Sequence, residues 1–250
     1  MKLKTQDYSI FGKFNFERKP VGIKFLPYIP ESIDRLSKSL YFCQMFKEAQ
    51  TSKPFYTQRD DFHCTEPLTL GMEDPDPVLL SGLVGETDDL YEELRANQKI
   101  YLLVPRMLKG SVKCVLFSAI DQMTYDPDVL IITADNVDQA RIIMRALVYS
   151  TGETWSSKGT PVLACSWLYV YPYISGEVNY MVTGMSMGMQ TLKVLPQGLM
   201  LISIPWTKLL MIMRNLQNMN WHPVSETITG EEHKKRFEQI LKDIEGKIRK

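Results

Sequence analysis

Residues 112–133 read VKCVLFSAIDQMTYDPDVLIIT, and this stretch decides the fold class. Its two ends, Val112 to Ile120 and Val129 to Thr133, are apolar and rich in β-branched residues, which is typical of buried strands. The residues between them include Asp126-Pro127-Asp128, a sequence that favours a turn. The stretch therefore predicts two strands joined by a turn region.

A helix is expected directly after the second strand. Asn136-Val137-Asp138-Gln139 is typical of a capping box, in which the first residue and the residue three positions later each satisfy a backbone N–H of the other. The helix is predicted to run through Tyr149 and to close at Gly152, because glycine adopts the left-handed backbone that ends many helices. Strand, strand and helix make the central unit.

Upstream, Val21-Gly22-Ile23-Lys24-Phe25-Leu26 alternates apolar residues as a half-buried strand does. Lys24 falls on the face opposite Ile23, where it either meets solvent or points into a cleft. Residues Ile33 to Gln50 indicate a helix that carries Cys43, with Ser37-Lys38-Ser39 as a point at which it can be interrupted. The irregular stretch from Thr51 to Pro77 carries Cys64, and loops of this length inside a domain are often functional.

Downstream segments complete the expected set of elements. A further short helix is expected from Thr87 as N-cap, followed by Asp88 and Asp89. Later predictions are strands at Val162 to Tyr173, Tyr180 to Val182 and Leu199 to Ile204, a helix at Thr207 to Leu216, and an amphipathic C-terminal helix begun by a Thr229–Glu232 capping box. We therefore expect an α/β or α+β fold, in which residues 1–250 form one layered domain with a mixed β-sheet flanked by helices and a helical extension at about 228–249.

Composition excludes some classes of function. The 29 basic and 29 acidic side chains balance, which argues against nucleic acid as a partner because phosphate binding needs a basic surplus. The most apolar region, 198–213, is interrupted by Pro205 and Lys208, so no membrane span is expected. The first residues have no apolar core of a signal peptide, which predicts a cytoplasmic protein with reduced thiols.

The common catalytic and metal motifs do not occur in this sequence. It has no Gly-rich phosphate loop, no G-x-G-x-x-G, no G-x-S-x-G, no H-E-x-x-H and no Cys-x-x-Cys pair. Cys43, Cys64 and Cys165 are candidate ligands only if the fold brings them together, whereas Cys114 in an apolar strand indicates a small buried hydrophobe. Spacing by itself favours packed thiols over ligands.

The run Met185-Ser186-Met187-Gly188-Met189 places three thioethers at alternate positions. Thioethers suit Cu(I), but methionine is abundant in this chain at 14 residues. Flexible filling of a core or cleft is the favoured interpretation.

Several short segments, taken in order, resemble domain-of-unknown-function family 169, a family without an established activity that occurs in archaea and anaerobic bacteria. The resemblance runs from about Lys19 to Leu216. It rests on short segments of matching order and spacing: Lys19-Pro20-Val21-Gly22-Ile23-Lys24-Phe25, Tyr41-Phe42-Cys43-Gln44, His63-Cys64, Phe117 through Ile131 as a central hairpin, Gln139-Ala140-Arg141 through Gly152, Cys165, Pro172, Gly176 and Ile204-Pro205.

The resemblance implies that Cys43, Cys64 and Cys165 form a set, because relatives also place cysteine at these positions and not at Cys114. Relatives often carry another cysteine in a Cys-x-Gly-x-Arg-like stretch, where this chain has Thr183 and lacks the arginine. A three-cysteine site with an open position is therefore implied, or else a member whose ancestral role has changed.

Three hypotheses for function follow. The first is a metal- or iron–sulfur-binding accessory or redox protein of anaerobic metabolism, with Cys43, Cys64 and Cys165 as ligands to a cluster or transition metal. The second is a metal-free binding protein or thiol enzyme whose cleft for an anionic small molecule is framed by Lys24, Arg141 and Tyr149. The third is a non-catalytic subunit of a larger complex. Whether the chain is an enzyme, and whether it pairs with another protein or a second copy of itself, stay open.

Overall fold

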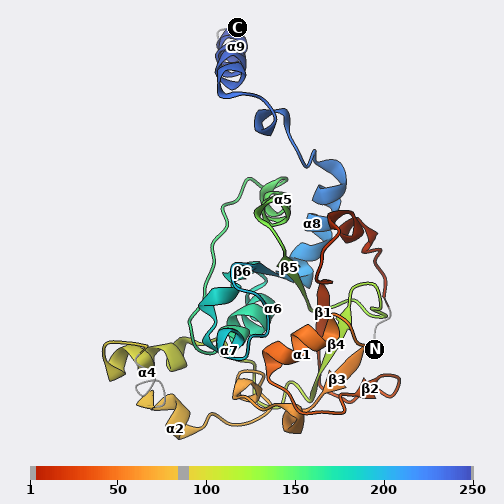
Figure 1. Cartoon of the computed structure of the whole chain (residues 1–250), viewed down its shortest axis with the longest axis vertical. Coiled ribbons are helices and arrows are strands. Elements are labelled where there is room, and N and C mark those ends of the chain that lie inside the picture. Colours follow the sequence, from red (N-terminus) through yellow and green to blue (C-terminus); the bar gives the residue numbers. More distant parts are fainter. Residues whose placement is uncertain (1–3, 84–89, 249–250) are drawn as a thin grey trace. The chain divides into compact units, whose positions relative to one another are not determined.

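The computed structural model describes residues 4–83 and 90–248 (Figure 1). The chain divides into two compact units, Met1–Gln217 and Asn218–Lys250. The helix start expected at Thr87, Asp88 and Asp89 lies outside the described residues.

In the described part of the chain, the strands of the first unit form one seven-stranded sheet in the order β2-β3-β4-β1-β5-β7-β6. The strands are β1 (Val21–Leu26), β2 (Asp34–Arg35), β3 (Phe55–Thr57), β4 (Cys114–Ala119), β5 (Val129–Ala134), β6 (Asn179–Val182) and β7 (Met200–Pro205). The β2–β3 pair is parallel and the other neighbouring strands are antiparallel. The predicted mixed sheet flanked by helices is confirmed.

Strand β1 lies between β4 and β5, so the central hairpin implied by the family resemblance is wrong. Ile23 faces Phe117 on one neighbour and Val129 on the other. The segment between β4 and β5 passes β1 on its way, because the backbone N–H of Asp128 donates to the Ile23 carbonyl (2.8 Å) and the Tyr125 hydroxyl donates to the Gly22 carbonyl (3.1 Å). Strand β1 is thus paired along both of its edges, and only Lys24 of its residues is not fully buried, so it is more buried than the half-buried strand expected from its alternation.

Most helices of the first unit lie close to this sheet, whereas α2 and α4 lie together away from it (Figure 1). The α-helices are α1 (Phe42–Ala49), α2 (Pro77–Leu80), α4 (Leu94–Leu103), α5 (Val137–Val148), α6 (Tyr171–Ser175), α7 (Met187–Thr191) and α8 (Trp206–Asn218). The 3₁₀ turns are η1 (Ser9–Phe14), η2 (Arg59–Asp61), η3 (Glu66–Leu68) and η5 (Thr183–Met185), and a π-helix, η4, spans Ser166–Val170.

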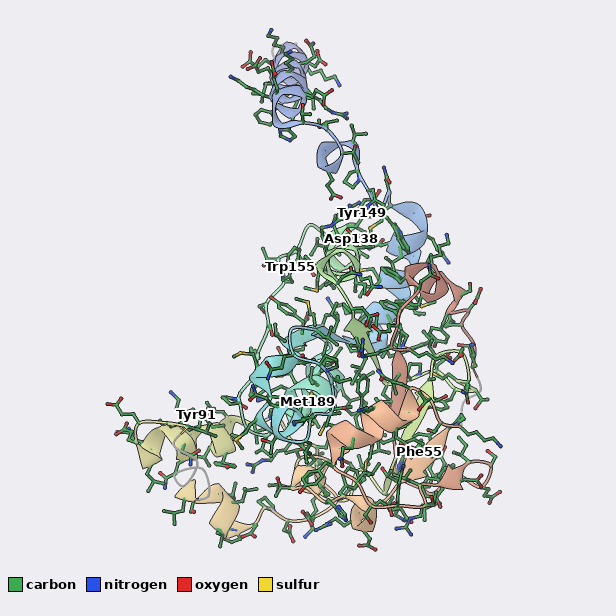
Figure 2. The ribbon with its side chains drawn as sticks, viewed as in Figure 1. Phe55, Tyr91, Asp138, Tyr149, Trp155 and Met189 are labelled. Carbon is green, nitrogen blue, oxygen red and sulfur yellow. The ribbon has the colours of Figure 1, made fainter. Side chains whose placement is uncertain are left out.

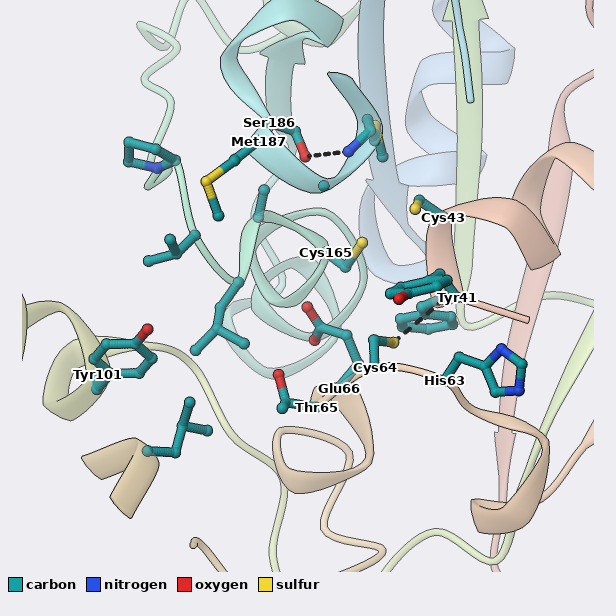
Figure 3. Close-up of a pocket in the computed structure, with 18 residues that line it drawn as sticks. Tyr41, Cys43, His63, Cys64, Thr65, Glu66, Tyr101, Cys165, Ser186 and Met187 are labelled. Atoms are coloured by element: carbon teal, nitrogen blue, oxygen red, sulfur yellow. Dashed lines mark hydrogen bonds between the residues drawn. The ribbon is translucent and has the colours of Figure 1, made fainter. Parts of the chain in front are cut away.

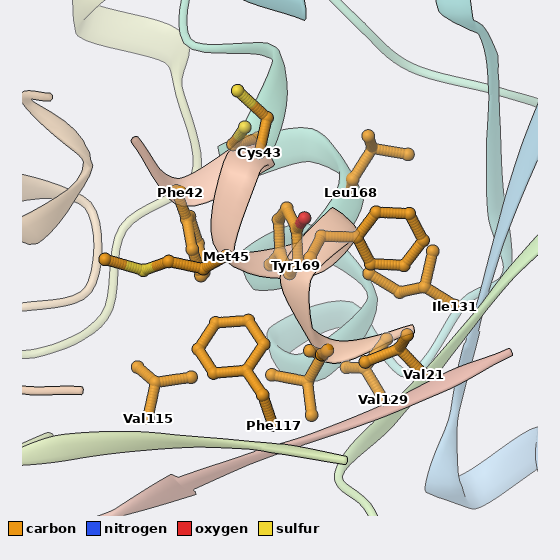
Figure 4. Close-up of a cluster of buried hydrophobic side chains, with 14 of the residues drawn as sticks. Val21, Phe42, Cys43, Met45, Val115, Phe117, Val129, Ile131, Leu168 and Tyr169 are labelled. Carbon is orange, nitrogen blue, oxygen red and sulfur yellow. The ribbon is translucent and has the colours of Figure 1, made fainter. Parts of the chain in front are cut away.

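One face of the sheet carries the largest buried cluster (Figure 4). Val21, Ile23 and Phe25 of β1 point to this face, and α1 and the π-helix η4 cover it with side chains that include Phe42 and Tyr169. The ring centroids of Phe42 and Tyr169 are 4.1 Å apart with an interplanar angle of 25°. The apolar face of the sheet therefore brings α1 and η4 together.

The helix predicted after β5 is confirmed as α5. The Asn136 side chain caps it by accepting the backbone N–H of Gln139 at 2.9 Å. Gly152 closes the turn after it with a φ of 66° and donates its N–H to the Val148 carbonyl at 2.8 Å. The helix is fixed by its own local capping residues.

The helix predicted for Ile33 to Gln50 is wrong in its first half. Only α1 is helical there, and residues 34–35 form β2. The backbone N–H groups of Leu36 and Leu40 donate to the carbonyls of Tyr56 and Asp61, so this segment pairs with the chain that follows α1 instead of bonding to itself. Pairing with a distant segment overrides the local helical pattern.

The strand predicted for Val162 to Tyr173 is also wrong, because η4 and α6 occupy residues 166–175. The side chains of Leu168, Tyr169 and Val170 are buried in the core cluster that also contains residues of the sheet and α1. Pro172 lacks an N–H, and its ring would crowd the Leu168 carbonyl in a regular α-helix. The wider π-turn, in which the Tyr171 N–H bonds the Ser166 carbonyl, accommodates this proline.

The second unit contains η6 (Val224–Glu226) and α9 (Gly230–Ile248). The predicted capping box is confirmed, since the Thr229 N–H donates to Glu232 Oε2 at 2.8 Å and the Glu232 N–H donates to Thr229 Oγ1 at 3.3 Å. None of the described residues of α9 is buried.

No helix in residues 4–83 and 90–248 is both long and apolar enough to cross a membrane.

Gly22 provides a test of the packing around β1. A Cβ atom at this position would collide with the sulfur of the buried Met123 and lie 3.2 Å from Cβ of Pro127. We expect Gly22→Ala to lower the free energy of unfolding by about 1–3 kcal/mol, because there is no room for a methyl group. Urea denaturation measures this loss. Gly12→Ala is the control, since nothing lies within 4 Å of a Cβ there, and an equal loss in both variants would contradict the packing.

Candidate functional site

Three segments that are distant in the sequence bring cysteines to one cavity of about 350 Å³ (Figure 3). Cys43 is the second residue of α1, Cys64 lies between η2 and η3, and Cys165 directly precedes the π-helix η4. All three line the cavity wall. Cys114 does not, and it is fully buried in β4, as expected of a small hydrophobe.

The aromatic ring of Phe42 holds these three segments in place. It stacks on Tyr169 of η4 and meets Phe62, near Cys64, edge-on at a centroid distance of 5.5 Å. It also meets Phe117 of the sheet edge-on at 5.8 Å. Each cysteine therefore lies close in the sequence to an aromatic residue that takes part in the contacts of Phe42.

The thiols of Cys43 and Cys165 are neighbours in the cavity wall, and their sulfurs face each other in Figure 3. The interaction with the Cys165 thiol lowers the pKa of Cys43, and the backbone N–H groups of Gln44 and of Cys43 itself at the start of α1 lower it further. The same interaction, burial and the nearby Glu66 raise the pKa of Cys165 well above its ordinary value. Cys43 is thus the thiol of the pair that loses its proton first.

Cys64 is held differently. Its sulfur accepts the backbone N–H of Phe42 at 3.4 Å, which ties the loop after η2 to the first turn of α1. Burial, with a smaller contribution from Glu66, raises the pKa of Cys64 to about 12. The thiol keeps its proton at neutral pH unless a cation replaces that proton.

Glu66 is a buried acid in the wall of the same cavity and is 5% exposed. Its Oε2 accepts hydrogen bonds from the hydroxyls of Ser166, at 2.8 Å, and Thr69, at 2.9 Å. Burial raises the pKa of Glu66 to about 7, although both hydroxyl bonds act in the opposite direction. The carboxyl group therefore changes its charge near neutral pH.

Acidic groups dominate the cavity. Three thiols and one carboxyl line it, while no lysine or arginine does so among the described residues. His63 is the basic side chain of the lining, and it is exposed, with its ring edge-on to Tyr41 at 6.1 Å. Each proton lost in this cavity leaves a negative charge with no basic partner nearby, so the deprotonated site attracts cations.

As the side chains stand, no group of three or more His, Cys, Asp or Glu residues within the described ranges is arranged to hold a metal ion. The Cys64 sulfur instead accepts the backbone N–H of Phe42. A metal ion would need side-chain rotation about the Cα–Cβ bonds of the cysteines to draw the sulfurs together.

Glu66 was not among the site residues predicted from the sequence, whereas the methionines fill the core and the cavity wall as predicted. Glu66 lies two residues after Cys64, and an acid so close to a candidate ligand was the available signal. Met187 and Met189 belong to the lining, and Met189 is 1% exposed. Thr183, at the position of the extra cysteine of relatives, lies outside this lining, and its hydroxyl donates to the Pro196 carbonyl at 2.6 Å.

Lys24, Arg141 and Tyr149, the expected frame of an anion cleft, do not share a described cavity. Lys24 Nζ donates to the Asp126 carbonyl at 2.8 Å and forms an ion pair with Asp128 at 3.2 Å. Arg141 lines a separate cavity beside α5, and Tyr149, after the last residue of that helix, is 52% exposed.

The raised pKa of Glu66 predicts a pH-dependent stability. An unfolded Glu ionises near its ordinary pKa of 4.5, whereas the folded one keeps its proton to about 7, so stability falls as pH rises through this window. Glu66→Gln cannot ionise and should gain on the order of 2–3 kcal/mol relative to the unmodified chain between pH 4.5 and 7. Urea denaturation under reducing conditions measures this difference. The exposed Glu245→Gln is the control, and parallel pH profiles for all three proteins would refute the assignment.

Comparison with known proteins gives one match. The model of the uncharacterised ArCR family, domain-of-unknown-function family 169 (DUF169), matches residues 10–215. No curated protein and no solved structure matches the chain. The matched residues span β1 through α8 and include every cysteine and Glu66 of the cavity. The chain therefore belongs to domain-of-unknown-function family 169.

Proposed function

We propose that the chain is a metal- or iron–sulfur-binding accessory protein of anaerobic metabolism, with Cys43, Cys64 and Cys165 as ligands. One observation carries the proposal: cysteines from three distant segments line a single cavity together with a buried carboxyl and no lysine or arginine among the described lining residues. Thiolates are preferred ligands of iron–sulfur clusters and of zinc.

The protonation states support binding of a cation. The unliganded cavity keeps its protons on Cys64, Cys165 and, below about pH 7, Glu66, because burial disfavours their charged forms. A bound cation removes this penalty by balancing the thiolate charges, and the protons leave to solvent. The pKa of Cys43 is already lowered, so this thiol binds first.

The Cys43–Cys165 pair supports a shared ion as well. Sulfurs that bind one zinc ion at ~2.3 Å in a tetrahedral arrangement lie roughly 3.8 Å apart, so neighbouring thiols such as Cys43 and Cys165 are suited to share one ion. Cys64 must turn away from the Phe42 N–H to join them. Glu66 or a substrate is then available for the fourth position, which is how reactive metal sites are built.

Metal and sulfide analysis of anaerobically purified protein tests the proposal. We expect bound metal, with or without acid-labile sulfide, and a loss of most of it in Cys43→Ser, Cys64→Ser and Cys165→Ser. Titration with Co²⁺ should produce a thiolate-to-cobalt charge-transfer absorption that weakens in the same variants. Cys114→Ser is the matched control, because Cys114 lies outside the cavity.

Two results would count against the proposal. One is a metal-free protein that takes up neither Co²⁺ nor a reconstituted cluster. The other is an equal loss of metal in Cys114→Ser, which would assign the effect to unfolding.

The neighbouring Cys43 and Cys165 thiols, of which Cys43 has the lowered pKa, favour a second candidate, thiol–disulfide exchange without metal. The Cys43 thiolate attacks a small-molecule disulfide and releases one half of it as a thiolate. The other half stays bound to Cys43 as a mixed disulfide. Cys165 then loses its proton and attacks the Cys43 sulfur, which releases the second thiol and closes a Cys43–Cys165 disulfide. Glu66 is a buried carboxyl group of the same cavity, and its pKa is about 7. Its carboxylate form can accept the proton that Cys165 loses.

Oxidation distinguishes the two candidates. Treatment of the metal-free protein with oxidised glutathione should link Cys43 to Cys165, as peptide mapping would show, while Cys165→Ser should stop at the mixed disulfide on Cys43. If glutathione attaches to Cys64 or Cys114 first, the exchange reaction is not the function of this pair.

A further inference from the structure

A larger cavity of about 600 Å³ lies in the first unit and shares no lining residue with the cysteine cavity. It is bounded by α5, by β6 and β7 at one edge of the sheet, and by the segment before η4. Figure 2 shows Trp155 of that segment beside α5 in this view. The side chains that the argument uses are Arg141, Met144, Arg145, Trp155, Tyr180 and Met200.

The walls of this cavity are mainly apolar and partly open to solvent. Val137, Ala140 and Met144 present one face of α5 to it at helical spacing. Trp155 is 48% exposed, and Val182 is 41% exposed. Apolar surface that gathers around a hollow of this size is typical of a ligand site, for which volumes of about 300–1,000 Å³ are usual.

The charged side chains of the cavity are of one sign. Arg141 and Arg145 lie one turn apart on α5, and no Asp or Glu belongs to the lining among the described residues. Arg141 forms an ion pair with Asp138 at 2.6 Å, on the half-exposed surface of the same helix. Asn136 and Val137 place the N-terminal turn of α5 at this cavity, and the positive end of the helix dipole adds to its attraction for anions.

We propose that this cavity binds a small aromatic anion, namely a planar ring system that carries a carboxylate, phosphate or sulfonate group. The ring packs against Trp155, Met144 and Tyr180, where flat apolar surface and thioether groups are available. The anionic group meets Arg141 and Arg145, whose planar guanidinium groups match such oxyanions.

A neighbouring cavity gives room for a substituent on this ligand. It has a volume of about 280 Å³ and shares Tyr180 and Val182 with the larger one. The segment that forms its outer wall is fixed along the edge strand β6, because Lys158 and Asn179 exchange backbone–side-chain hydrogen bonds of 2.8 and 2.9 Å. The binding of an aromatic anion is independent of the proposed metal site, since the two cavities have no residue in common.

Two matched fluorescent probes test the proposal on the full chain. 8-Anilinonaphthalene-1-sulfonate carries an anionic group, and N-phenyl-1-naphthylamine has the same ring system without that group. We expect Arg141→Met and Arg145→Met each to weaken binding of the sulfonate about tenfold and to leave the neutral probe within about twofold, because a charge-assisted hydrogen bond is lost. Trp155→Ala should weaken both probes several-fold.

Controls separate this site from other apolar surface. Arg214→Met removes an exposed arginine of α8 that does not line the cavity, and it should change neither probe. Arg145→Lys, which keeps the charge and the helix, should give an intermediate affinity for the sulfonate. Circular dichroism and thermal melting confirm that each variant is folded.

Three results would overturn the proposal. The first is that neither probe binds the unmodified chain. The second is that the sulfonate binds with an affinity that neither the arginine variants nor Trp155→Ala change. The third is that the arginine variants weaken binding of the two probes equally, which would mean that the anionic group is not recognised.

Discussion

The ring of Phe42 is the contact on which the cysteine cavity depends. It touches an aromatic ring from each of three other segments: Phe62 beside the Cys64 loop, Phe117 in the sheet and Tyr169 in the π-helix after Cys165. Cys43 follows Phe42 directly in α1. A single buried side chain thereby holds three segments of the chain at fixed positions, because close-packed rings leave little freedom to shift.

This packing also creates the electrostatic character of the cavity. The aromatic and aliphatic surroundings exclude water from Cys64, Cys165 and Glu66, and this burial favours their neutral forms. Cys43 differs, because the start of α1 and the Cys165 thiol stabilise its thiolate. The site thus has one thiol that ionises easily and three acidic groups with raised pKa values. Such a site can bind a cation in exchange for protons, or it can use the Cys43 thiolate as a nucleophile.

The two cavities for which ligands are proposed have opposite chemistry. Acids line the cysteine cavity, whereas two arginines and apolar side chains line the cavity beside α5. Tyr180 and Val182 connect the second cavity to a smaller one, which reaches Pro161, and Pro161 also lines the cysteine cavity. The segment between Trp155 and Val162 thus contributes lining residues to all three cavities, although the cysteine cavity and the cavity beside α5 share none.

The local sequence determined the helices and strands that depend on interactions between neighbouring residues. The apolar runs of β1, β4 and β5, the Asn136 cap and Gly152 closure of α5, and the Thr229–Glu232 capping box were all predictable, since each depends on neighbouring residues. Tertiary structure decided the rest. Strand β1 inserts between β4 and β5, residues 166–175 become helical around Pro172, and Lys24 is paired with Asp128 instead of joining Arg141. Tertiary structure also decided the convergence of the three cysteines. The family resemblance implied this convergence, whereas the spacing of the cysteines in the sequence did not. The convergence requires contacts between residues more than a hundred positions apart, and such contacts form only when the whole apolar face of the sheet is covered.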